Sequence, residues 1–435
     1  MKITIIGTGY VGLVSGVLFA DLGNDVICVD NDNKKINLLK KGIVPIYEPG
    51  LEEILKKNIK SKRIKFTSNI SEAIKLSKII FIAVGTPTAR DGISADLKNV
   101  YKVAKDISKN INNYKIIVNK STVPIGTGDE VEKIILRKNK KKKFDIISNP
   151  EFLREGEAIR DFKYPDRIVI GSNNLKKTKP ILEKLYLPII NKGAKFLTVS
   201  RRSSELIKYA SNAFLATKIT FINEIANLCE STNTNVEDIA IGIGTDQRIG
   251  SRFLRAGPAF GGSCFPKDTR AIVKTANKFS VDLSIIKTVI KSNENRKKLI
   301  TNKIIKILGS VKRKRIGFLG VTFKANTDDM RDSQFLKIYP KLLKKGASLS
   351  YYEPTGKKYE IKSSKIKFVS TIKQILENND MIVIHTEWDE FRSINFSNFN
   401  IKKGTKIFDL RNLYKIKNIS NKKIRYYSIG RPNYE

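Results

Sequence analysis

The chain has 435 residues, of which 41% are hydrophobic and 9% aromatic, enough apolar material for two or three folded domains. This composition excludes a disordered or fibrous protein, because neither Gly nor Pro is enriched. The 82 Lys and Arg residues exceed the 42 Asp and Glu residues and give a net charge of +40. Because the lysines are spread along the whole chain, we expect a basic solvated surface and no specific nucleic-acid partner.

The three cysteines, Cys28, Cys229 and Cys264, are too few and too unevenly spaced for a disulfide framework or a zinc site, and no metal site is expected. The expected compartment is a reducing cytosol. The apolar stretch 3–20 superficially resembles a signal-peptide core, but its four glycines are spaced as in a turn between a strand and a helix. Later apolar runs stay below the roughly 18 to 20 residues of a membrane span, so we expect a soluble protein with no membrane partner.

Short β-branched runs alternate with amphipathic stretches over the first 150 residues. The predicted strands are 2–6, 25–30, 78–84, 115–119 and 144–148. This alternation is typical of a doubly wound parallel sheet. The basic run 137–143, before the last of these strands, is expected to be an exposed loop or the fraying end of a helix.

A glycine-rich turn follows the first predicted strand. It reads Gly7-Thr8-Gly9-Tyr10-Val11-Gly12, and Asp30 lies 18 residues beyond Gly12 at the end of the second strand. In this context the three glycines allow a tight turn, the approach of backbone N–H groups to a pyrophosphate, and close packing of helix on strand. Asp30 is expected to accept hydrogen bonds from both ribose hydroxyls and to repel a 2′-phosphate. The pattern predicts NAD rather than NADP, although Lys34 and Lys35 weaken the repulsion.

Two Thr-Pro loops follow later strands of the same sheet. Thr86-Pro87-Thr88 and Ser121-Thr122-Val123-Pro124 both come after a strand, at the sheet edge where nucleotide-binding folds hold their ligands. Turn formation explains these residues equally well, because Pro restricts φ and Thr hydrogen-bonds its own backbone. Contact with a cofactor and simple turn chemistry both remain open.

A long uninterrupted helix is predicted over 203–230, with Ser203 or Ser204 as its N-cap and no internal Gly or Pro. Lys208 and Asn212 are one turn apart and lie on one face of it. They precede apolar residues of the same stripe, so we expect them to meet a partner, with a solvated helix end as the alternative. The segment 149–156, which reads NPEFLREG, is a further candidate whose charges could equally belong to an exposed turn.

The best candidate for covalent chemistry is Cys264, in the segment FGGSCFPKD. The preceding glycines leave its sulfur accessible, and Lys267 can favour the thiolate, although an inert thiol in a tight turn is the alternative. The other two cysteines are expected to be small buried hydrophobes. His385, the only histidine, falls in an apolar predicted strand, which favours a buried structural role over acid–base chemistry. More helix is expected after Asp268.

A second series of predicted strands, at 315–319, 348–352, 381–385 and 406–410, follows the basic stretch 312–315. It indicates a second α/β unit. We therefore predict an α/β protein with a Rossmann-type doubly wound domain at 1–200, a central long-helix region at 201–311 and a C-terminal Rossmann-like domain at 312–435.

These motifs together resemble the nucleotide-sugar dehydrogenases, and among them the UDP-glucose 6-dehydrogenases, across nearly the entire chain. The similar segments are GTGYVGL, VGTPT followed by DGISADL, KSTVPIGT, NPEFLREG, DFKYPDRIVIG, ELIKYASNAFLATKITFINE, DQRIGSRFL, AFGGSCFPKD and FKANTDDMRDS. The resemblance implies a cytosolic homodimer built on the central helix, with an N-terminal NAD domain and a C-terminal UDP domain. It also implies two successive NAD-dependent oxidations of UDP-glucose to UDP-glucuronate.

The resemblance also implies roles for individual residues. Cys264 captures the aldehyde as a thiohemiacetal that becomes a thioester, and water then releases the acid. Lys208 and Asn212 stabilise the oxyanion, Asp268 assists deprotonation, and Thr122 and Glu151 position water and hydroxyl. The implied cofactor contacts are Gly7, Gly9, Tyr10, Val11, Gly12, Asp30, Lys35, Thr86, Thr122, Glu155, Lys267 and Arg331. The implied substrate contacts are Glu151, Phe152, Leu153, Lys208, Asn212, Phe253, Leu254, Arg255, Ala256, Gly257, Gly261, Lys324 and Arg411, with Arg248 reaching from the partner subunit.

One residue departs from the pattern of the resemblance. Ala259 stands where Gly is usual, and its methyl group matters only if this residue needs a positive φ. Two alternatives remain. One is a relative acting on GDP-mannose or on an N-acetylated UDP-hexosamine, although the latter group typically has GGHC where this chain has Ser263 before Cys264. The other is a basic nucleic-acid-binding protein that has a Rossmann fold but no enzymatic activity. The net charge favours this alternative, whereas the motifs do not support it.

Overall fold

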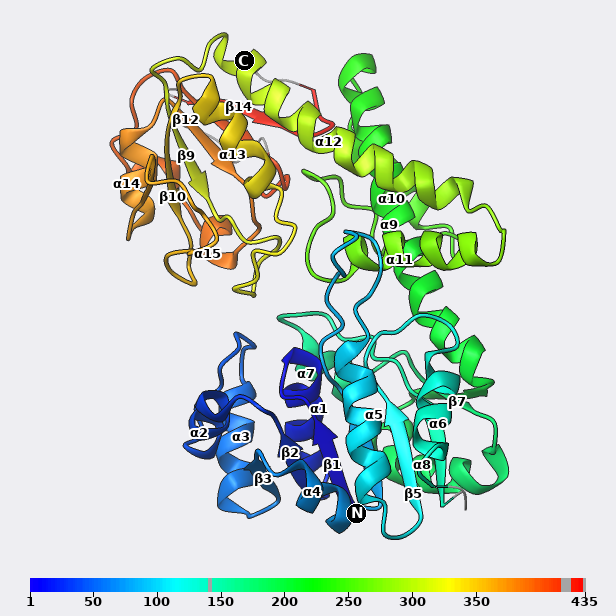
Figure 1. The fold of residues 1–435 in the computed structure, drawn as a ribbon. Coiled ribbons are helices and arrows are strands. Elements are labelled where there is room, and N and C mark those ends of the chain that lie inside the picture. The colour runs from blue at the N-terminus through cyan, green and yellow to red at the C-terminus, as the bar shows by residue number, and fades with distance from the viewer. Residues whose placement is uncertain (140–142, 416–423, 433–435) are drawn as a thin grey trace. The chain divides into compact units, whose positions relative to one another are not determined.

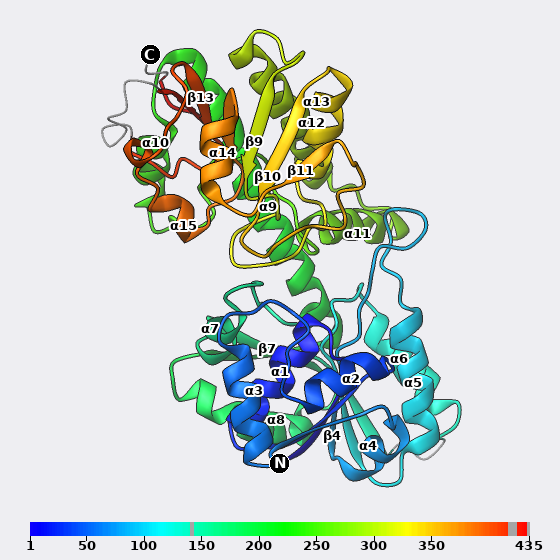
Figure 2. The same ribbon diagram turned by 90° about the vertical axis from the view of Figure 1, so that its left-hand side faces the viewer.

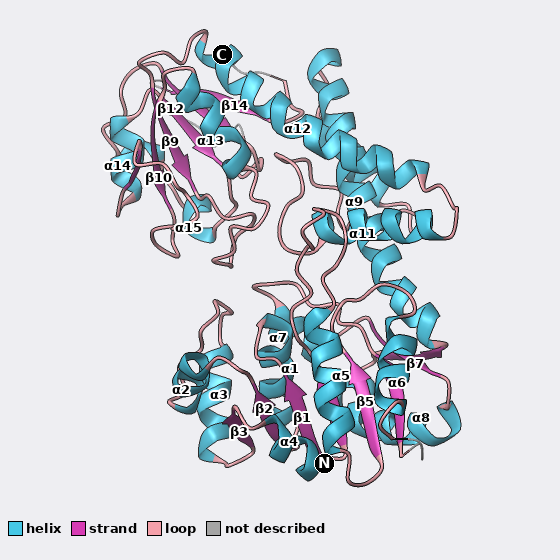
Figure 3. Cartoon of the chain, in the orientation of Figure 1, coloured by secondary structure: helices cyan, strands magenta, loops and turns pink. Residues whose placement is uncertain are grey.

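The computed structural model describes residues 1–139, 143–415 and 424–432. It divides into two compact units, Met1–Ser211 with Lys274–Ser280 and Asn212–Val273 with Val281–Glu435. Each unit contains its own sheet with helices packed against it (Figure 1), and Figure 3 distinguishes the strands from the helices. The predicted α/β fold is confirmed. The division into three parts at 1–200, 201–311 and 312–435 stays a prediction.

The sheet of the first unit has the order β3-β2-β1-β4-β5-β6-β7-β8. Its strands are β1 (Lys2–Ile6), β2 (Asp25–Val29), β3 (Ile64–Thr67), β4 (Ile79–Ile82), β5 (Lys115–Asn119), β6 (Phe144–Ser148), β7 (Arg167–Ser172) and β8 (Lys195–Val199). Strands β1 to β6 are parallel, whereas β7 runs antiparallel to β6. The strand order reverses between β1 and β4, and doubly wound sheets bind their ligands outside the carboxyl ends of the strands at such a reversal.

Helices cover both faces of this sheet (Figure 1, Figure 2). They are α1 (Tyr10–Asp21), α2 (Asn33–Lys40), α3 (Leu51–Lys60), α4 (Ile70–Leu76), α5 (Lys98–Asn110), α6 (Thr127–Leu136), α7 (Ala158–Lys163) and α8 (Leu175–Ile190). Along β4, Ile79 and Phe81 pack with α1 and α8, whereas Ile80 and Ile82 pack with α4, α5 and α6. Because both of its faces are covered, β4 is apolar at all four of its positions.

The second unit contains a six-stranded parallel sheet in the order β11-β10-β9-β12-β13-β14 within the described residues. Its strands are β9 (Arg315–Leu319), β10 (Ser348–Tyr352), β11 (Ile366–Phe368), β12 (Met381–Ile384), β13 (Thr405–Asp409) and β14 (Ile424–Ser428). Its helices are α10 (Val236–Gly244), α11 (Phe265–Lys278), α12 (Ser284–Leu308), α13 (Phe335–Lys344), α14 (Ile372–Asn378), α15 (Asp389–Arg392) and the short 3₁₀ helix η1 (Phe396–Asn398). The last residues of α11 belong to the first unit.

The long helix α9 (Arg201–Thr232) begins two residues before the predicted start. The predicted cap was wrong. Ser200 Oγ accepts the hydrogen bond from Ser203 N at 3.1 Å, so Ser203 and Ser204 lie inside the helix. Ser204 instead donates its hydroxyl to Ser148 O at 2.8 Å, which ties α9 to the end of β6. Several strands also differ by one or two residues from the prediction, as β4 does.

Two further expectations concern membrane spans and the basic run 137–143. Of the helices that the structure describes, none is both long and apolar enough to cross a membrane. Helix α6 ends at Leu136, within one residue of the basic run 137–143, and residues 140–142 of that run lie outside the described part of the chain.

Candidate active site

The glycine-rich turn joins β1 to α1 and has the close packing that a dinucleotide cradle requires. Gly7 has a φ of 100°, and a Cβ atom there would lie 2.7 Å from Ala83 O. A Cβ atom on Gly12 would lie 1.9 Å from Gly7 O. Gly9 caps α1 without a side-chain hydrogen bond, and nothing lies within 4 Å of the position of a Cβ atom there. The turn therefore closes tightly and leaves room at the first amides of α1, which fits a pyrophosphate.

Asp30 follows β2 and is held by the turn itself. Its Oδ2 accepts from Thr8 N at 2.8 Å and from Thr8 Oγ1 at 2.7 Å, and Lys35 Nζ lies 3.4 Å away. Burial opposes ionisation, but hydrogen bonds from Thr8 and Asp32 and the charge of Lys35 hold the pKa of Asp30 below its ordinary value. The carboxylate is therefore ionised and oriented. Sequence reasoning missed Thr8, whose position between two glycines is the only available signal.

Glu48 is a buried carboxylate that the sequence did not single out. It accepts hydrogen bonds from the Tyr10 hydroxyl, from Gly156 N at 2.7 Å and from Ala158 N at 2.8 Å. Burial, together with the Glu48 carboxylate, raises the pKa of Tyr10 above its ordinary value. Glu48 thereby ties the glycine-rich turn to the NPEFLREG segment and to α7. These residues are far apart in the chain, so no sequence pattern points to the contact.

The NPEFLREG segment contains three charged residues, of which Glu151 is buried, Glu155 half-buried and Arg154 exposed. Glu151 and Lys208 are 5% and 4% exposed, and Lys208 Nζ lies 3.0 Å from Glu151 Oε1. The second oxygen, Glu151 Oε2, accepts from Leu153 N at 2.5 Å. The Phe152 ring lies 5.3 Å from Lys208 Nζ. The solvated-end alternative for Lys208 and the exposed-turn alternative for Glu151 are therefore wrong, whereas Arg154 is exposed and pairs with Asp161.

The two Thr-Pro loops contact each other at the carboxyl edge of the first sheet. Thr86 Oγ1 donates to Thr122 O at 2.9 Å, and Ser121 Oγ donates to Val84 O at 2.7 Å. On the other side, the Glu205 carboxylate of α9 accepts from Gly126 N and Gly128 N at 2.6 and 2.8 Å. Glu205 thus caps α6 and anchors the loop that contains Thr122. Both interpretations of Thr86 and Thr122 remain open.

In the second unit, Cys264 immediately precedes α11 and its carbonyl accepts the first hydrogen bond of that helix, from Asp268 N at 2.8 Å. Its side chain is half-buried, and Sγ lies 3.5 Å from Ser263 Oγ. The predictions for the other two cysteines are confirmed, because Cys28 and Cys229 are both buried and burial raises the pKa of the Cys28 thiol. Cys264 is therefore the cysteine with the most accessible sulfur.

Asp268 is the centre of a polar cluster one turn into α11. It is 1% exposed and accepts from Asn212 Nδ2 at 2.6 Å through Oδ2 and from Lys267 Nζ at 2.5 Å through Oδ1. Asn212 is itself 6% exposed, so the predicted partner of this helix position is Asp268. The Lys267 ammonium group is neutralised by Asp268, which weakens the predicted effect of Lys267 on the thiol.

The loop before Cys264 is held by contacts at Ala259, Phe260 and Gly261. Asn293 Oδ1 accepts from Phe260 N at 2.9 Å, and Gln334 Nε2 donates to Ala259 O at 2.8 Å. A Cβ atom on Gly261 would lie 2.4 Å from Asp332 O. Ala259 has a φ of 143°, so the condition under which its methyl group matters is met. Such a backbone conformation costs a non-Gly residue about 1–3 kcal/mol.

Two predicted substrate residues, Arg411 and Gly257, lie close together at the carboxyl end of the second sheet. Arg411, just after β13, donates to His385 O at 2.8 Å and to Phe323 O at 3.1 Å. A Cβ atom on Gly257 would lie 3.5 Å from Arg411 Nη1. His385 is buried as predicted, and burial lowers its pKa well below the ordinary value.

The other predicted contacts are more dispersed. Leu254 packs in the core, Phe253 has a positive φ, and Arg255 is exposed. Arg331 is exposed and pairs with Asp329. Arg248, with its side chain 89% exposed, pairs with Asp246 of its own chain at 2.6 Å. The remaining predicted contacts, Lys35, Glu155, Ala256 and Lys324, are half-buried.

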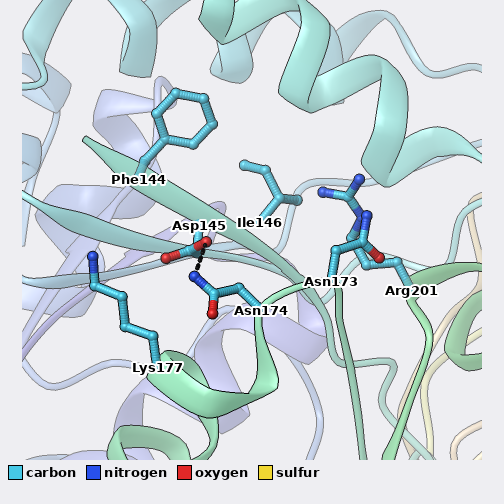
Figure 4. A pocket seen from close by; sticks show the side chains of 7 residues that line it. All are labelled: Phe144, Asp145, Ile146, Asn173, Asn174, Lys177 and Arg201. Carbon is cyan, nitrogen blue, oxygen red and sulfur yellow. Dashed lines mark hydrogen bonds between the residues drawn. The ribbon is translucent and has the colours of Figure 1, made fainter. Parts of the chain in front are cut away.

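A cavity of about 330 Å³ is lined by Phe144, Asp145, Ile146, Asn173, Asn174, Lys177 and Arg201 (Figure 4). It opens along β6 and the start of α8, and its charged groups already have partners. Asn174 Nδ2 donates to Asp145 Oδ1, and Arg201 pairs with Asp129 and Glu132 at 2.6 Å each. It contains no predicted site residue, and we assign it no part in the chemistry.

Comparison with known proteins settles the family. Residues 1–190, 202–295 and 317–416 match the NAD binding, central and UDP binding domains of the UDP-glucose/GDP-mannose dehydrogenase family. The chain belongs to this family. It is 48% identical to the UDP-glucose 6-dehydrogenase of Rhizobium meliloti (strain 1021) over the full length of both proteins. The family assignment confirms the predictions of NAD as cofactor and of an NAD-dependent oxidoreductase.

Two solved structures extend the comparison. A UDP-glucose dehydrogenase from the hyperthermophilic archaeon Pyrobaculum islandicum is 34% identical, with a TM-score of 0.90 and coverage of 98% of this chain and 96% of its own. A GDP-mannose dehydrogenase from Pseudomonas aeruginosa is 30% identical, with a TM-score of 0.55 and coverage of 98% and 99%.

Proposed function

We propose that this chain oxidises UDP-glucose to UDP-glucuronate in two NAD-dependent steps. The observation that carries the proposal is the half-buried Cys264 at the start of α11, followed one turn later by the buried Asp268 with its Asn212 and Lys267 partners. A dehydrogenase that stops at an aldehyde has no need of a thiol, whereas a second oxidation of the same carbon is made easier by covalent capture. The 48% identical relative that bears this activity in its name supports the choice.

NAD, when bound, accepts one hydride in each oxidation. In the first oxidation the sugar alcohol loses that hydride and a proton to become an aldehyde. The Cys264 thiolate adds to the aldehyde carbon and gives a thiohemiacetal, which loses a second hydride and a proton to become a thioester. Water adds to the thioester, the C–S bond breaks, and the carboxylate leaves with the thiol restored.

The surrounding residues supply charge and hydrogen bonds for these steps. Lys208 and Asn212 stabilise the oxyanion that forms whenever the carbon becomes tetrahedral. Asp268 assists removal of the proton, and Glu151 and Thr122 position the hydroxyl and the water. The glycine-rich turn with Asp30 binds the cofactor, with Lys35, Thr86, Glu155, Lys267 and Arg331 as the other proposed contacts. Phe152, Leu153, residues 253–257, Gly261, Lys324 and Arg411 bind the nucleotide sugar.

A homodimer built on α9 is part of the proposal. Phe214, Phe221 and Leu228 recur every seven residues on this helix and are 65%, 49% and 58% exposed. Seven residues are close to two turns, so these side chains lie on one side of the helix, where an unpartnered apolar row indicates an interface. A second copy of this chain is the partner, and Arg248 of each copy contacts the other's substrate. We place the protein in the cytosol.

A turnover assay tests the function. The purified chain is given UDP-glucose, GDP-mannose or a UDP-N-acetylhexosamine with NAD. We expect turnover with UDP-glucose, two NADH for each sugar and no released aldehyde. GDP-mannose is the second candidate because its dehydrogenase shares the fold and 30% of the sequence. One NADH for each sugar with a free aldehyde contradicts the covalent scheme, and preference for another sugar contradicts the substrate.

A further inference from the structure

Lys120 is a buried lysine whose charge interacts with both Glu151 and Lys208, and it has no role in the scheme above. It is the first residue after β5, and its backbone N donates to Ile82 O at 2.9 Å. Only 5% of the residue is exposed. Its Nζ donates to Asn149 Oδ1 at 3.2 Å, two residues before Glu151 in the same segment. A lysine is rarely buried to this degree unless its charge is compensated.

The groups around Lys120 come from three other elements. The NPEFLREG segment contributes Asn149 and Glu151, and α9 contributes Lys208. Helix α8 contributes Tyr186, whose hydroxyl donates to the same Asn149 Oδ1 at 2.6 Å. Burial raises the pKa of Tyr186, so this phenol stays neutral. The charged members of the cluster are therefore two lysines and one carboxylate.

The net charge of this cluster determines how strongly it can stabilise the oxyanion that forms on the substrate carbon. The Lys208–Glu151 pair by itself is neutral, and a paired ammonium group offers little net attraction to a developing negative charge. A second buried cation changes this balance, because two ammonium groups and one carboxylate sum to one positive charge. We propose that Lys120 is a positioning residue for the oxidation, which acts through Glu151 and leaves the positive charge of Lys208 available to the oxyanion. This inference rests on the proposed function.

The protonation of Lys120 gives the cluster a pH dependence. Burial lowers the pKa of Lys120 to about 8, Glu151 raises it and Lys208 lowers it. Below this pH, Lys120 is an ammonium ion and the cluster has its extra positive charge. Above it, Lys120 is neutral and only the Lys208–Glu151 pair remains. The contribution of Lys120 to the rate is therefore present at low pH and is lost as the pH rises through about 8.

The test compares two buried lysines, one at each end of β5. In Lys120→Met the charge is removed while the chain keeps similar bulk. Lys115→Met is the matched control, because Lys115 begins β5, is 3% exposed and donates to Ser77 O at 2.7 Å, at the opposite end of the strand. The values of kcat and of KM for UDP-glucose and NAD are measured for each full-length variant from pH 6.5 to 9.5.

We expect Lys120→Met to lower kcat by about tenfold below pH 8 with little change in either KM, as removal of a charge effective in the transition state should do. The ratio of wild-type to variant kcat should fall towards one above pH 8. Lys120→Arg keeps a charge at every pH. Its kcat should therefore remain about tenfold above that of Lys120→Met at high pH as well. Lys115→Met should keep kcat at all pH values.

Each other outcome overturns the inference. A wild-type to Lys120→Met ratio that does not change with pH, an effect on KM alone, or an equal loss in Lys115→Met excludes the electrostatic role. If Lys120→Met fails to fold, Lys120→Gln, which keeps a donor for Asn149, is measured against the same criteria. A wild-type chain without turnover on UDP-glucose refutes the proposed function instead, so the two failures are distinguishable.

Discussion

Asn212 on the long helix α9 donates from Nδ2 to Asp268 Oδ2 at 2.6 Å, and both side chains are buried. This contact joins the predicted oxyanion residue to the predicted base. The second oxygen of Asp268 accepts from Lys267 Nζ, so each carboxylate oxygen has a hydrogen-bond partner. Asp268 is thereby oriented by two residues whose own positions are set by α9 and α11.

Replacing Asp268 with Asn removes the charge of the carboxylate but keeps an acceptor for the hydrogen bond from Asn212. The amide oxygen of Asn still accepts from Asn212, but it cannot take up a proton, so kcat should fall by about 100-fold or more. The control is Asp282→Asn, since Asp282 is an exposed partner of Lys287. Steady-state kinetics and thermal unfolding are measured for both. A variant that keeps more than half of the wild-type kcat contradicts the role of Asp268.

Replacing Asp30 with Ser should narrow the preference for NAD over NADP. The carboxylate is ionised and bound to Thr8, and its loss removes the repulsion of a 2′-phosphate while Lys35 remains nearby. The ratio of kcat/KM for the two cofactors is the measurement. Asp25→Ser, at the exposed start of β2, is the matched control and should leave the ratio unchanged. Equal use of both cofactors by the wild-type chain contradicts this interpretation of Asp30.

Replacing Ala259 with Gly should stabilise the protein. Glycine relieves strain of about 1–3 kcal/mol at this positive φ. This gain exceeds the roughly 0.4–1 kcal/mol of stability that is lost because Gly gives the unfolded chain more conformational entropy. The free energy of unfolding in urea should therefore rise. Ala276→Gly, inside α11, should lower it by about 1 kcal/mol. If both variants lose stability to the same degree, Ala259 is not strained.

Local patterns predicted nine of the fourteen strands of the described residues, because β-branched runs bounded by polar residues define strands over short distances. Strands β3, β7, β8, β11 and β14 were not predicted. Strands β5, β6, β9 and β10 have the predicted ends. The position of Cys264 after two glycines and the spacing of Lys208 and Asn212 are equally local features. The side chains that bind Lys208 and Asn212 were less predictable. Glu151 for Lys208 and Asp268 for Asn212 each lie 56 or 57 residues away, and only the folded chain brings them together.

The contacts of Glu48 and Lys120 lie beyond local patterns for the same reason. Glu48 reaches residues more than a hundred positions later, and Lys120 after β5 reaches Asn149 after the neighbouring β6. The missed N-cap of α9 has a different cause. Three serines within five residues, Ser200, Ser203 and Ser204, can each cap a helix, and the choice of Ser200 depends on Ser204 bonding to β6. The positive φ of Ala259 depends on its tertiary contacts, which the residue type does not reveal.

Replacing Glu48 with Gln should weaken cofactor binding. One of the two carboxylate oxygens becomes an amide nitrogen, which cannot accept from the backbone N–H groups of the segment at 156–158 or from Tyr10. The KM for NAD should rise more than the KM for UDP-glucose, and stability should fall by about 1–3 kcal/mol. Glu53→Gln, exposed on α3, is the control. Additive effects of Glu48→Gln and Tyr10→Phe in a double-mutant cycle would show that the two residues are not coupled.

The last prediction concerns Arg248, which pairs with Asp246 in its own chain and has a side chain that is 89% exposed. If Arg248 completes the partner's site, a guanidinium group must reach phosphate or sugar oxygens of the neighbour's substrate. An Arg248→Ala chain and a Cys264→Ala chain are each expected to be inactive as homodimers. In a mixed dimer, one site combines an intact cysteine with an intact arginine, while the other lacks both.

Mixing these two chains by unfolding and refolding them together should therefore restore activity. With random pairing about half of the dimers are mixed and each has one complete site, so recovery should approach roughly a quarter of the wild-type rate. The control is the same treatment of each chain alone. An exposed arginine bound only to its own Asp246 contributes little to either chain. In that case the mixture shows no more activity than the sum of the two parents, and the assignment of Arg248 to the neighbouring site must be abandoned.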